Sequence, residues 1–292
     1  MQSTIIEYLS EDYPERLRYI EKPPSRLYVK GNVDVLHEIG ISVIGSRTNT
    51  QYGEKMCKTF VKNLVEYNIS IISGLAVGID SIAHKTCLKN GGRTVAVLPS
   101  GFDNIYPPIH KELAQSIIDN GGVVISEYEN NMKADSKKFL ERNRIVAGLG
   151  IGTLVVEGGE RSGTSVTARY TREANRPVFC IPSSLENIKG KGTNELIKQG
   201  ATLVTNVTDI LEAYPNIKFY KVHNASKDIF LDIPEDLRTV YKNINNMPQD
   251  INQIAKKTGL SIGEVNYKTM LLQLDDKIKE LPGQRFVRNE DD

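Results

Sequence analysis

The sequence predicts an α/β fold: an extended Rossmann-like, doubly wound and mostly parallel sheet, followed by a small C-terminal winged-helix domain. Three observations lead to this prediction. Short β-branched runs alternate with longer amphipathic stretches between residues 40 and 214. These runs are apolar on both faces, as strands of a parallel sheet covered on two sides must be. Beyond residue 226 the pattern changes to three helical segments and a hairpin, which is typical of a winged helix-turn-helix.

The first 39 residues precede this alternation. They are too few to form a core of their own, so we expect a short N-terminal arm that packs on the sheet. Strands and helices are then expected in turn from residue 40 to 214. The expected strands are 41–44, 69–72, 94–98, 123–126, 153–156, 178–181 and 201–204. The expected helices are 52–67, 79–88, 110–118, 138–147, 164–174 and 194–198.

Residues 215–225 are interpreted as a linker and residues 226–292 as the winged-helix domain. The three expected helices are IPEDLRTVYKNI, DINQIAKKTGL and SIGEVNYKTMLLQL, and DKIKELPGQRFVR is expected to form the hairpin. This domain has 10 Lys and Arg against 12 Asp and Glu, and Lys268 is the only base of its third helix. Affinity for a DNA duplex depends largely on neutralised phosphates. We therefore expect the domain to bind protein or to regulate, with weak duplex contact through the hairpin.

Composition excludes several classes of protein. The chain has 292 residues and a net charge of +1. It has no apolar run long enough for a membrane span and no secretory signal pattern, so a cytoplasmic protein is expected. Three separated cysteines and four scattered histidines give neither metal-ligand spacing nor a nucleophile with a neighbouring base. No cofactor or metal is expected.

The carboxyl ends of the predicted parallel strands carry the candidate site. Ligands of α/β sheets collect at this edge, where loops meet helix N-termini. Gly45, Ser46 and Arg47 follow the first strand, SGLAVGID follows the second, and EGGERSGTSVTAR follows the fifth. Glycine allows close backbone approach, and hydroxyls donate to phosphate. Because neither G-x-G-x-x-G nor a Walker A loop stands there, a nicotinamide cofactor or a P-loop nucleotide is not expected.

Arg47 adds a permanently charged fork to this edge, which suits phosphodiester oxygens. An ion pair with Asp80 is the alternative. A second basic cluster, DSKKFLERNRIVAGL, favours the phosphate interpretation, because cations interleaved with an aromatic ring can track phosphates and stack a base. Its candidate residues are Lys137, Lys138, Phe139, Arg142 and Asn143.

Ordered motifs over residues 12 to 211 closely resemble the DNA processing protein A family, also called Smf. They include LYVKGN, ISVIGSR, SGLAVGIDSIAH, AVLPSGFDNIYP, FLERNRIVAGL, ERSGTSVTAR and GTNELIKQGA. The resemblance implies a non-enzymatic protein that binds single-stranded DNA, forms a homodimer and loads the recombinase RecA during natural transformation. It implies that Arg47 contacts the DNA backbone. It also implies that a DNA-binding groove is completed by Lys137, Lys138, Phe139, Arg142 and Asn143. Leu140 departs from the family, which often has proline there.

Two further interpretations stay open at this stage. Ser162, Gly163 and Thr164 open a helix whose N–H groups could hold another phosphate, with Arg169 one turn further; for Arg169, a helix ion pair with Glu173 is the alternative. The rival function is a nucleotide phosphoribohydrolase of the related fold. Its loop carries a glutamate where this chain has Val166 and Thr167, so the expected acid or base is missing, although Glu157 and Glu160 are nearby.

Overall fold

The computed structural model describes residues 3–160, 162–221, 233–245, 247–275 and 277–289. The chain divides into two compact units, Met1–Val222 and His223–Asp292, which are described separately. Among the described residues, no helix is long and apolar enough to cross a membrane.

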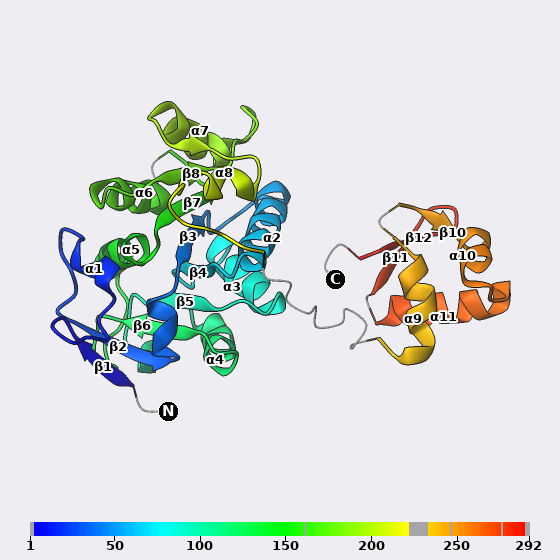
Figure 1. Cartoon of the computed structure of the whole chain (residues 1–292), viewed down its shortest axis with the longest axis horizontal. Helices are drawn as coiled ribbons and strands as arrows, with labels where there is room; N and C mark the ends of the chain where they lie inside the picture. The colour runs from blue at the N-terminus through cyan, green and yellow to red at the C-terminus, as the bar shows by residue number, and fades with distance from the viewer. Residues whose placement is uncertain (1–2, 161, 222–232, 246, 276, 290–292) are drawn as a thin grey trace. The chain divides into compact units, whose positions relative to one another are not determined.

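A single large sheet organises the first unit (Figure 1). Within the described residues its strands stand in the order β1-β2-β6-β5-β4-β3-β7-β8-β9. From β6 to β9 in this order all neighbours run parallel, whereas β1 and β2 are antiparallel to their neighbours. The predicted mostly parallel sheet is thus confirmed. The strand bounds are β1 Thr4–Glu7, β2 Arg26–Gly31, β3 Gly40–Gly45, β4 Ser70–Ser73, β5 Thr94–Val97, β6 Val123–Ser126, β7 Gly152–Glu157, β8 Val178–Cys180 and β9 Thr202–Leu203.

Helices cover both faces of this sheet, and each face has its own core. In β3, for example, Ile41 and Val43 pack in one cluster and Ile44 in the other, as the period of a strand requires. The helices of the first unit are α1 Glu15–Arg18, α2 Gln51–Glu66, α3 Ile79–Lys89, α4 Lys111–Asp119, α5 Ser136–Leu149, α6 Gly163–Glu173, α7 Lys191–Lys198 and α8 Val207–Leu211. Short 3₁₀ turns are η1 Val33–Leu36, η2 Phe102–Asn104, η3 Pro108–His110 and η4 Ile188–Gly190.

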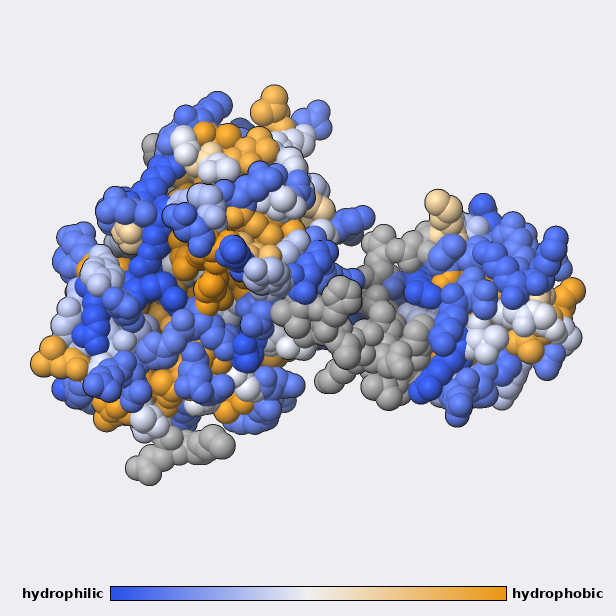
Figure 2. All heavy atoms as spheres, viewed as in Figure 1, coloured by the Kyte–Doolittle hydropathy of each residue, from blue (hydrophilic) through white to orange (hydrophobic). Residues whose placement is uncertain are grey.

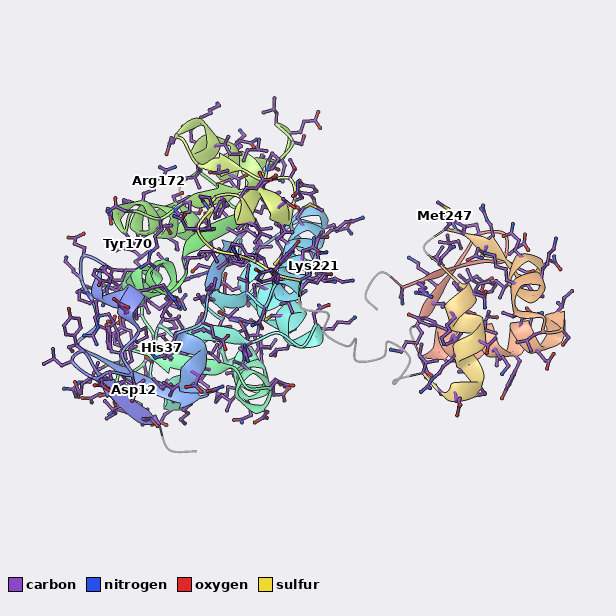
Figure 3. All side chains as sticks on the ribbon, viewed as in Figure 1. Asp12, His37, Tyr170, Arg172, Lys221 and Met247 are labelled. Carbon is purple, nitrogen blue, oxygen red and sulfur yellow. The ribbon has the colours of Figure 1, made fainter. Side chains whose placement is uncertain are left out.

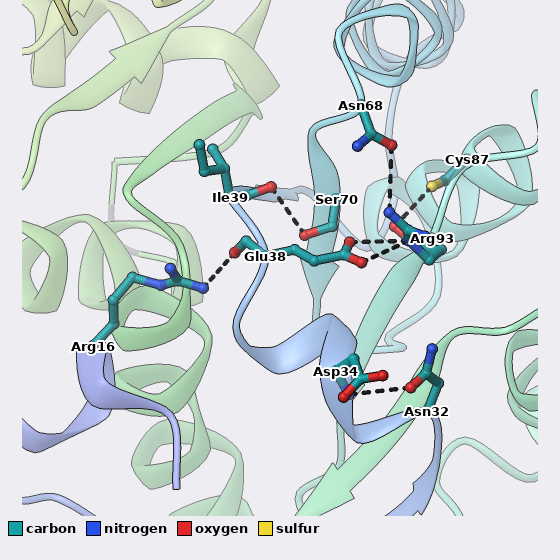
Figure 4. A network of polar contacts seen from close by, with 9 residues as sticks. All are labelled: Arg16, Asn32, Asp34, Glu38, Ile39, Asn68, Ser70, Cys87 and Arg93. Atoms are coloured by element: carbon teal, nitrogen blue, oxygen red, sulfur yellow. Dashed lines mark hydrogen bonds and ion pairs between the residues drawn. The ribbon is translucent and has the colours of Figure 1, made fainter. Parts of the chain in front are cut away.

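The N-terminal arm differs from the expectation in one respect. It joins the sheet as β1 and β2, rather than only packing on it, because β2 pairs with β6. Backbone carbonyls also fix the arm, because Arg16 donates to the Leu149 carbonyl at 2.7 Å. Arg16 donates to the Glu38 carbonyl as well, and the Glu38 carboxylate pairs with Arg93 at 2.8 Å (Figure 4). His37 Nε2 lies 3.2 Å from the Asp12 carbonyl (Figure 3).

The second unit has a separate core that includes Leu237, Tyr241, Val265 and Phe286. Its described elements are α9 Glu235–Asn243, β10 Gln249–Asp250, α10 Ile251–Thr258, α11 Ile262–Leu274, β11 Ile278–Leu281 and β12 Arg285–Arg288. The strands form an antiparallel sheet in the order β10-β12-β11. Gly259 ends α10 with φ 72°, a conformation that favours glycine. We interpret this order of helices and hairpin as a winged helix-turn-helix; sequence analysis did not anticipate β10.

Candidate nucleic-acid interface

The loop after β3 is packed tightly against the loop after β4. The Ile79 N–H donates to the Ser46 carbonyl at 3.2 Å. A Cβ on Gly78, which has φ 81°, would lie 2.3 Å from that carbonyl oxygen, and a Cβ on Gly45 would lie 2.5 Å from Ile79. Glycine is therefore needed at both positions for the two loops to approach. This packing leaves the next residue, Arg47, on the exposed rim of the sheet.

Arg47 meets two aromatic rings that come from other loops. Its guanidinium carbon lies 5.0 Å from the centroid of the Phe139 ring. The Tyr106 ring packs edge-to-face on Phe139, with centroids 5.2 Å apart and an angle of 75° between the planes. Arg47 follows β3, Tyr106 follows β5, and Phe139 lies in the first turn of α5. We call these three residues the Arg47 cluster.

The Arg47 cluster combines a permanent cation with ring surface. Arg47 and Tyr106 are exposed and Phe139 is half-buried. Among the described residues Arg47 makes no ion pair, and the alternative pairing with Asp80 is not found. Tyr106, in the loop that follows β5, is recognisable from the sequence as part of this edge, but it is not among the candidate DNA-binding residues. Such a cluster can bind a phosphate beside a stacked base.

Lys137 and Lys138 stand at the start of α5, where Asp135 caps the helix by accepting from the Lys138 N–H at 2.9 Å. The two ammonium groups differ. Lys138 Nζ is held by the Asp135 carboxylate at 2.7 Å and by the Lys133 carbonyl at 2.9 Å. The hydrogen bonds from Lys138 hold the pKa of Asp135 below its usual range. The Lys137 side chain is 84% exposed and reaches Glu141 at 3.5 Å, so it is the more available cation.

Arg142 lies in a different environment from that expected of a groove contact. The residue is 3% exposed, and its Nη1 donates to the Gly74 carbonyl at 2.6 Å and to the Val97 carbonyl. Arg142 stands one turn after Phe139. It faces the sheet because it lies on the side of α5 that also buries Ile145 and Val146. The guanidinium therefore does not reach the surface in this structure.

Asp80 is the charged partner of Arg142. Its Oδ2 accepts from the Gly74 N–H at 3.1 Å and from the Ala76 N–H at 3.4 Å. Burial raises the pKa of Asp80, and the positive charge of Arg142 partly counteracts this rise. Burial lowers the pKa of Arg142 to about 10, and the negative charge of Asp80 partly counteracts this fall. A Cβ on Gly74 would lie 2.5 Å from Arg142 and 2.7 Å from Asp80. The buried pair thus holds the loop after β4 in place, beneath Arg47.

Asn143 connects α5 to the start of α6. Its Nδ2 donates to the Gly163 carbonyl at 3.4 Å, and its Oδ1 accepts from Arg142 Nε at 3.3 Å. Ser162 is the N-cap of α6 but makes no side-chain cap hydrogen bond. Its hydroxyl donates instead to the Gly159 carbonyl at 2.8 Å and lies 2.5 Å from the hydroxyl of buried Thr164. The first backbone N–H groups of α6 therefore receive no capping hydrogen bond from the Ser162 side chain. Gly163, the first residue of the helix, is exposed.

Arg169 stands apart from the Arg47 cluster. Its guanidinium pairs with Glu173 at 3.5 Å and lies 5.0 Å from the centroid of the Tyr170 ring. Arg169 and Tyr170 line a pocket with Lys22 and Arg144; Figure 3 labels Tyr170 on α6. The ion pair that sequence analysis gave as the alternative for Arg169 is therefore present.

Glu157, one of the two carboxylates near the loop that a hydrolase could use, is already engaged, whereas Glu160 is exposed. Glu157 is 1% exposed, and its carboxylate accepts from the Thr50 N–H at 2.8 Å, the Thr50 hydroxyl at 2.7 Å and Asn187 Nδ2 at 3.0 Å. These bonds fix the start of α2. His84 is buried, and its Nδ1 lies 2.8 Å from the Thr94 hydroxyl. In the part of the chain that the structure describes, no group of three or more acidic, His or Cys side chains could hold a metal ion.

The doubly wound, mostly parallel sheet defines a Rossmann-like protein, and the Arg47 cluster is the candidate binding site at its carboxyl edge. Residues 4–215 match the family model described as DNA recombination-mediator protein A, and the chain belongs to this family.

The relatives and solved structures agree with that assignment. Protein Smf of Escherichia coli is 37% identical over 284 residues, which cover 94% of this chain and 74% of that protein. DprA of Streptococcus pneumoniae is 40% identical over 206 residues, or 70% of this chain and 72% of that one. The X-ray structure of DprA from S. pneumoniae has a TM-score of 0.70 and 37% identity, covering 75% and 76% of the chains.

DprA from Helicobacter pylori has a TM-score of 0.66 and 29% identity, over 73% of this chain and 95% of that one. That structure is described as giving insight into a unique single-stranded DNA binding mode.

Proposed function

We propose that this chain binds single-stranded DNA at the carboxyl edge of its sheet, as a binding protein and not as an enzyme. The Arg47 cluster carries this proposal, because it presents a cation and two ring faces on an exposed rim. The single-stranded DNA binding mode described for the H. pylori relative supports it. Lys137 extends the positive rim along α5, while Arg142 and Asp80 hold the loop beneath it. Ser162 and Gly163 offer the next phosphate position at the start of α6.

The test is a fluorescence-anisotropy titration of a labelled oligothymidine at several salt concentrations. Each phosphate neutralised on a single strand contributes about −0.7 to the slope of log K against log salt. Arg47→Ala and Lys137→Ala should each weaken binding and make this slope shallower. Lys62→Ala, which removes an exposed lysine of α2, is the matched control and should leave both quantities unchanged. Wild-type protein that fails to bind the oligonucleotide would overturn the proposal.

We further propose that the bound protein, as a homodimer, loads the recombinase RecA onto the strand during natural transformation or recombination. The description of the family as recombination mediators supports this step. RecA loading implies that this protein acts in the cytoplasm, where RecA works. The experiment measures RecA ATPase on DNA coated with single-strand-binding protein. Wild-type protein should shorten the lag, and Arg47→Ala should not; an unchanged lag with wild-type protein would contradict RecA loading but not DNA binding.

A further inference from the structure

Helix α11 of the second unit is apolar on two opposite faces. One face packs in the core through Val265, Thr269 and Leu272, which are buried. On the other face Tyr267, Met270 and Leu274 are 58%, 50% and 74% exposed. Figure 2 shows hydrophobic side chains at the surface along the edge of the second unit that α11 forms. A helix of one independent domain needs only one apolar face, so the outer face requires another explanation.

The exposed side chains form a continuous stripe. At 100° per residue, Gly263, Tyr267, Met270 and Leu274 fall within about 60° of one another around the helix axis. A Cβ on Gly263 would meet nothing within 4 Å, so the stripe is open at that end. We call these four residues the α11 stripe. It carries no base, whereas the phosphates of a duplex require several. Its chemistry is that of a helix-packing surface.

The spacing of the α11 stripe indicates which helix would cover it. The midpoint of α11, Ile262–Leu274, is near Lys268 and Thr269. Gly263 and Leu274 are equally distant from a point between those two residues, and so are Tyr267 and Met270. In an antiparallel pair of identical helices, Gly263 therefore faces Leu274 of the other copy, and Tyr267 faces its Met270. A small residue opposite a large one, at both ends, allows the two backbones to approach evenly.

The charges at the C-terminal end of α11 disfavour the parallel arrangement. Asp275 is the exposed C-cap residue. In a parallel pair the two Asp275 carboxylates would lie side by side and repel. In the antiparallel pair they lie at opposite ends, each level with an N-terminus that Glu264 of its own helix already caps by accepting from the Ser261 N–H at 2.9 Å. The helix-end charges thus disfavour the parallel pair, and the apolar contacts select the antiparallel one.

We propose that the second unit self-associates through the α11 stripe, as an antiparallel, two-fold symmetric pair with α11 of a second copy of this chain. One helix on one helix buries less than the roughly 800 Å² per partner of a standard interface. The contact is consequently weak alone. It gains strength when copies are already concentrated by another contact or by a shared ligand, because pairing is then governed by their effective concentration.

Disulfide trapping in the full chain tests this geometry. The native thiols of Cys57, Cys87 and Cys180 are all buried, so an exposed engineered thiol reacts selectively. Gly263→Cys and Leu274→Cys proteins are oxidised separately and as an equal mixture, without DNA. In the antiparallel pair the two different positions meet, whereas identical positions are 11 residues apart, or about 16 Å along the axis. The mixture should therefore give at least about five times more covalent dimer than either protein alone.

Two further variants separate a specific contact from random collision. Adding Met270→Glu to both proteins places a charge at the centre of each stripe, and it should reduce the dimer yield of the mixture at least about fivefold. Leu9→Glu is the matched control, because Leu9 is 87% exposed in the other unit, and it should leave the yield unchanged. Equal yields from all three samples, a yield that Met270→Glu does not change, or predominant Gly263→Cys homodimer would overturn the proposal. Failure to trap any dimer in the mixture would overturn it as well.

Discussion

Arg47 and Arg142 stand near each other at the sheet edge, yet the structure predicts opposite consequences for their removal. Arg142→Ala leaves Asp80 as an uncompensated buried charge and removes the donor to the carbonyls of Gly74 and Val97. Arg142 and Asp80 are buried opposite charges that interact electrostatically, and removing one of two such charges costs about 3 to 5 kcal/mol of unfolding free energy. For a unit of this size, that corresponds to a fall in Tm of about 6 to 20 °C. Arg47→Ala, at an exposed position without an ion pair, should change stability by no more than about 0.5 kcal/mol.

The effects on DNA binding should be reversed. Urea unfolding followed by circular dichroism gives the stability, and anisotropy of an oligothymidine at several salt concentrations gives the slope. Arg47→Ala should make the salt slope shallower by about 0.7, the share of one phosphate on a single strand. Arg142→Ala, measured where it is still folded, should keep the wild-type slope. A stable Arg142→Ala protein with a shallower slope would refute the assignment of Arg142 as a buried positioning residue.

A double variant keeps this test decisive if Arg142→Ala does not fold. In Asp80→Asn/Arg142→Met, neither member of the pair is charged, so no unpaired buried charge remains. We expect this protein to be more stable than Arg142→Ala, and to bind DNA with the wild-type salt slope. Greater loss of stability in the double variant than in Arg142→Ala would show that the pair is not the source of the cost.

Three other results are expected. Phe139→Ala should weaken oligothymidine binding by about 1 to 3 kcal/mol through lost stacking, while leaving the salt slope intact; an unchanged affinity in anisotropy would remove the ring from the site. Burial lowers the pKa of His84 to about 3, so the unfolded chain binds more protons between pH 6.5 and 3, and stability falls as the pH falls. His84→Asn should remove up to about 1.4 kcal/mol per pH unit of that dependence, measured by urea unfolding from pH 7 to 5. Removing residues 223–292 should lower affinity for duplex DNA by much less than tenfold in anisotropy, because α11 has Lys268 as its only base and only the hairpin is expected to make weak duplex contact; a tenfold loss would refute this.

The sequence was sufficient to predict the parallel strands β3 to β9 and the edge at which the candidate residues following β3 and β7 lie. Strand and helix periods differ strongly in this chain, and glycine after a strand identifies a loop that approaches something closely. The predicted segment 138–147 and the observed α5, Ser136–Leu149, differ by two residues at each end, as helix boundaries commonly do.

Side-chain direction could not be predicted in the same way. Lys138, Phe139 and Arg142 are close in sequence, and a basic-aromatic pattern does not show which of them faces the sheet. Arg142 faces it because the side of α5 that also buries Ile145 and Val146 packs on the sheet, where its guanidinium meets the carbonyls of Gly74 and Val97. The contact of Tyr106 with Phe139 was not predicted for the related reason that it joins residues 33 positions apart. Contacts of this kind are set by how the loops fold together, which residue spacing does not encode.

The exposed cluster depends on buried polar groups at each strand end. Glu157, the last residue of β7, holds the start of α2 through Thr50, and Arg142 with Asp80 holds the loop after β4. Ser126, at the end of β6, donates to the Ser100 carbonyl at 2.7 Å and so fixes the segment that leads to Tyr106. Each bond satisfies a backbone group that the end of a strand would otherwise leave buried and unpaired. Because these bonds are internal, substitutions there should alter stability first and DNA affinity only through the position of the loops, whereas substitutions in the Arg47 cluster should do the reverse.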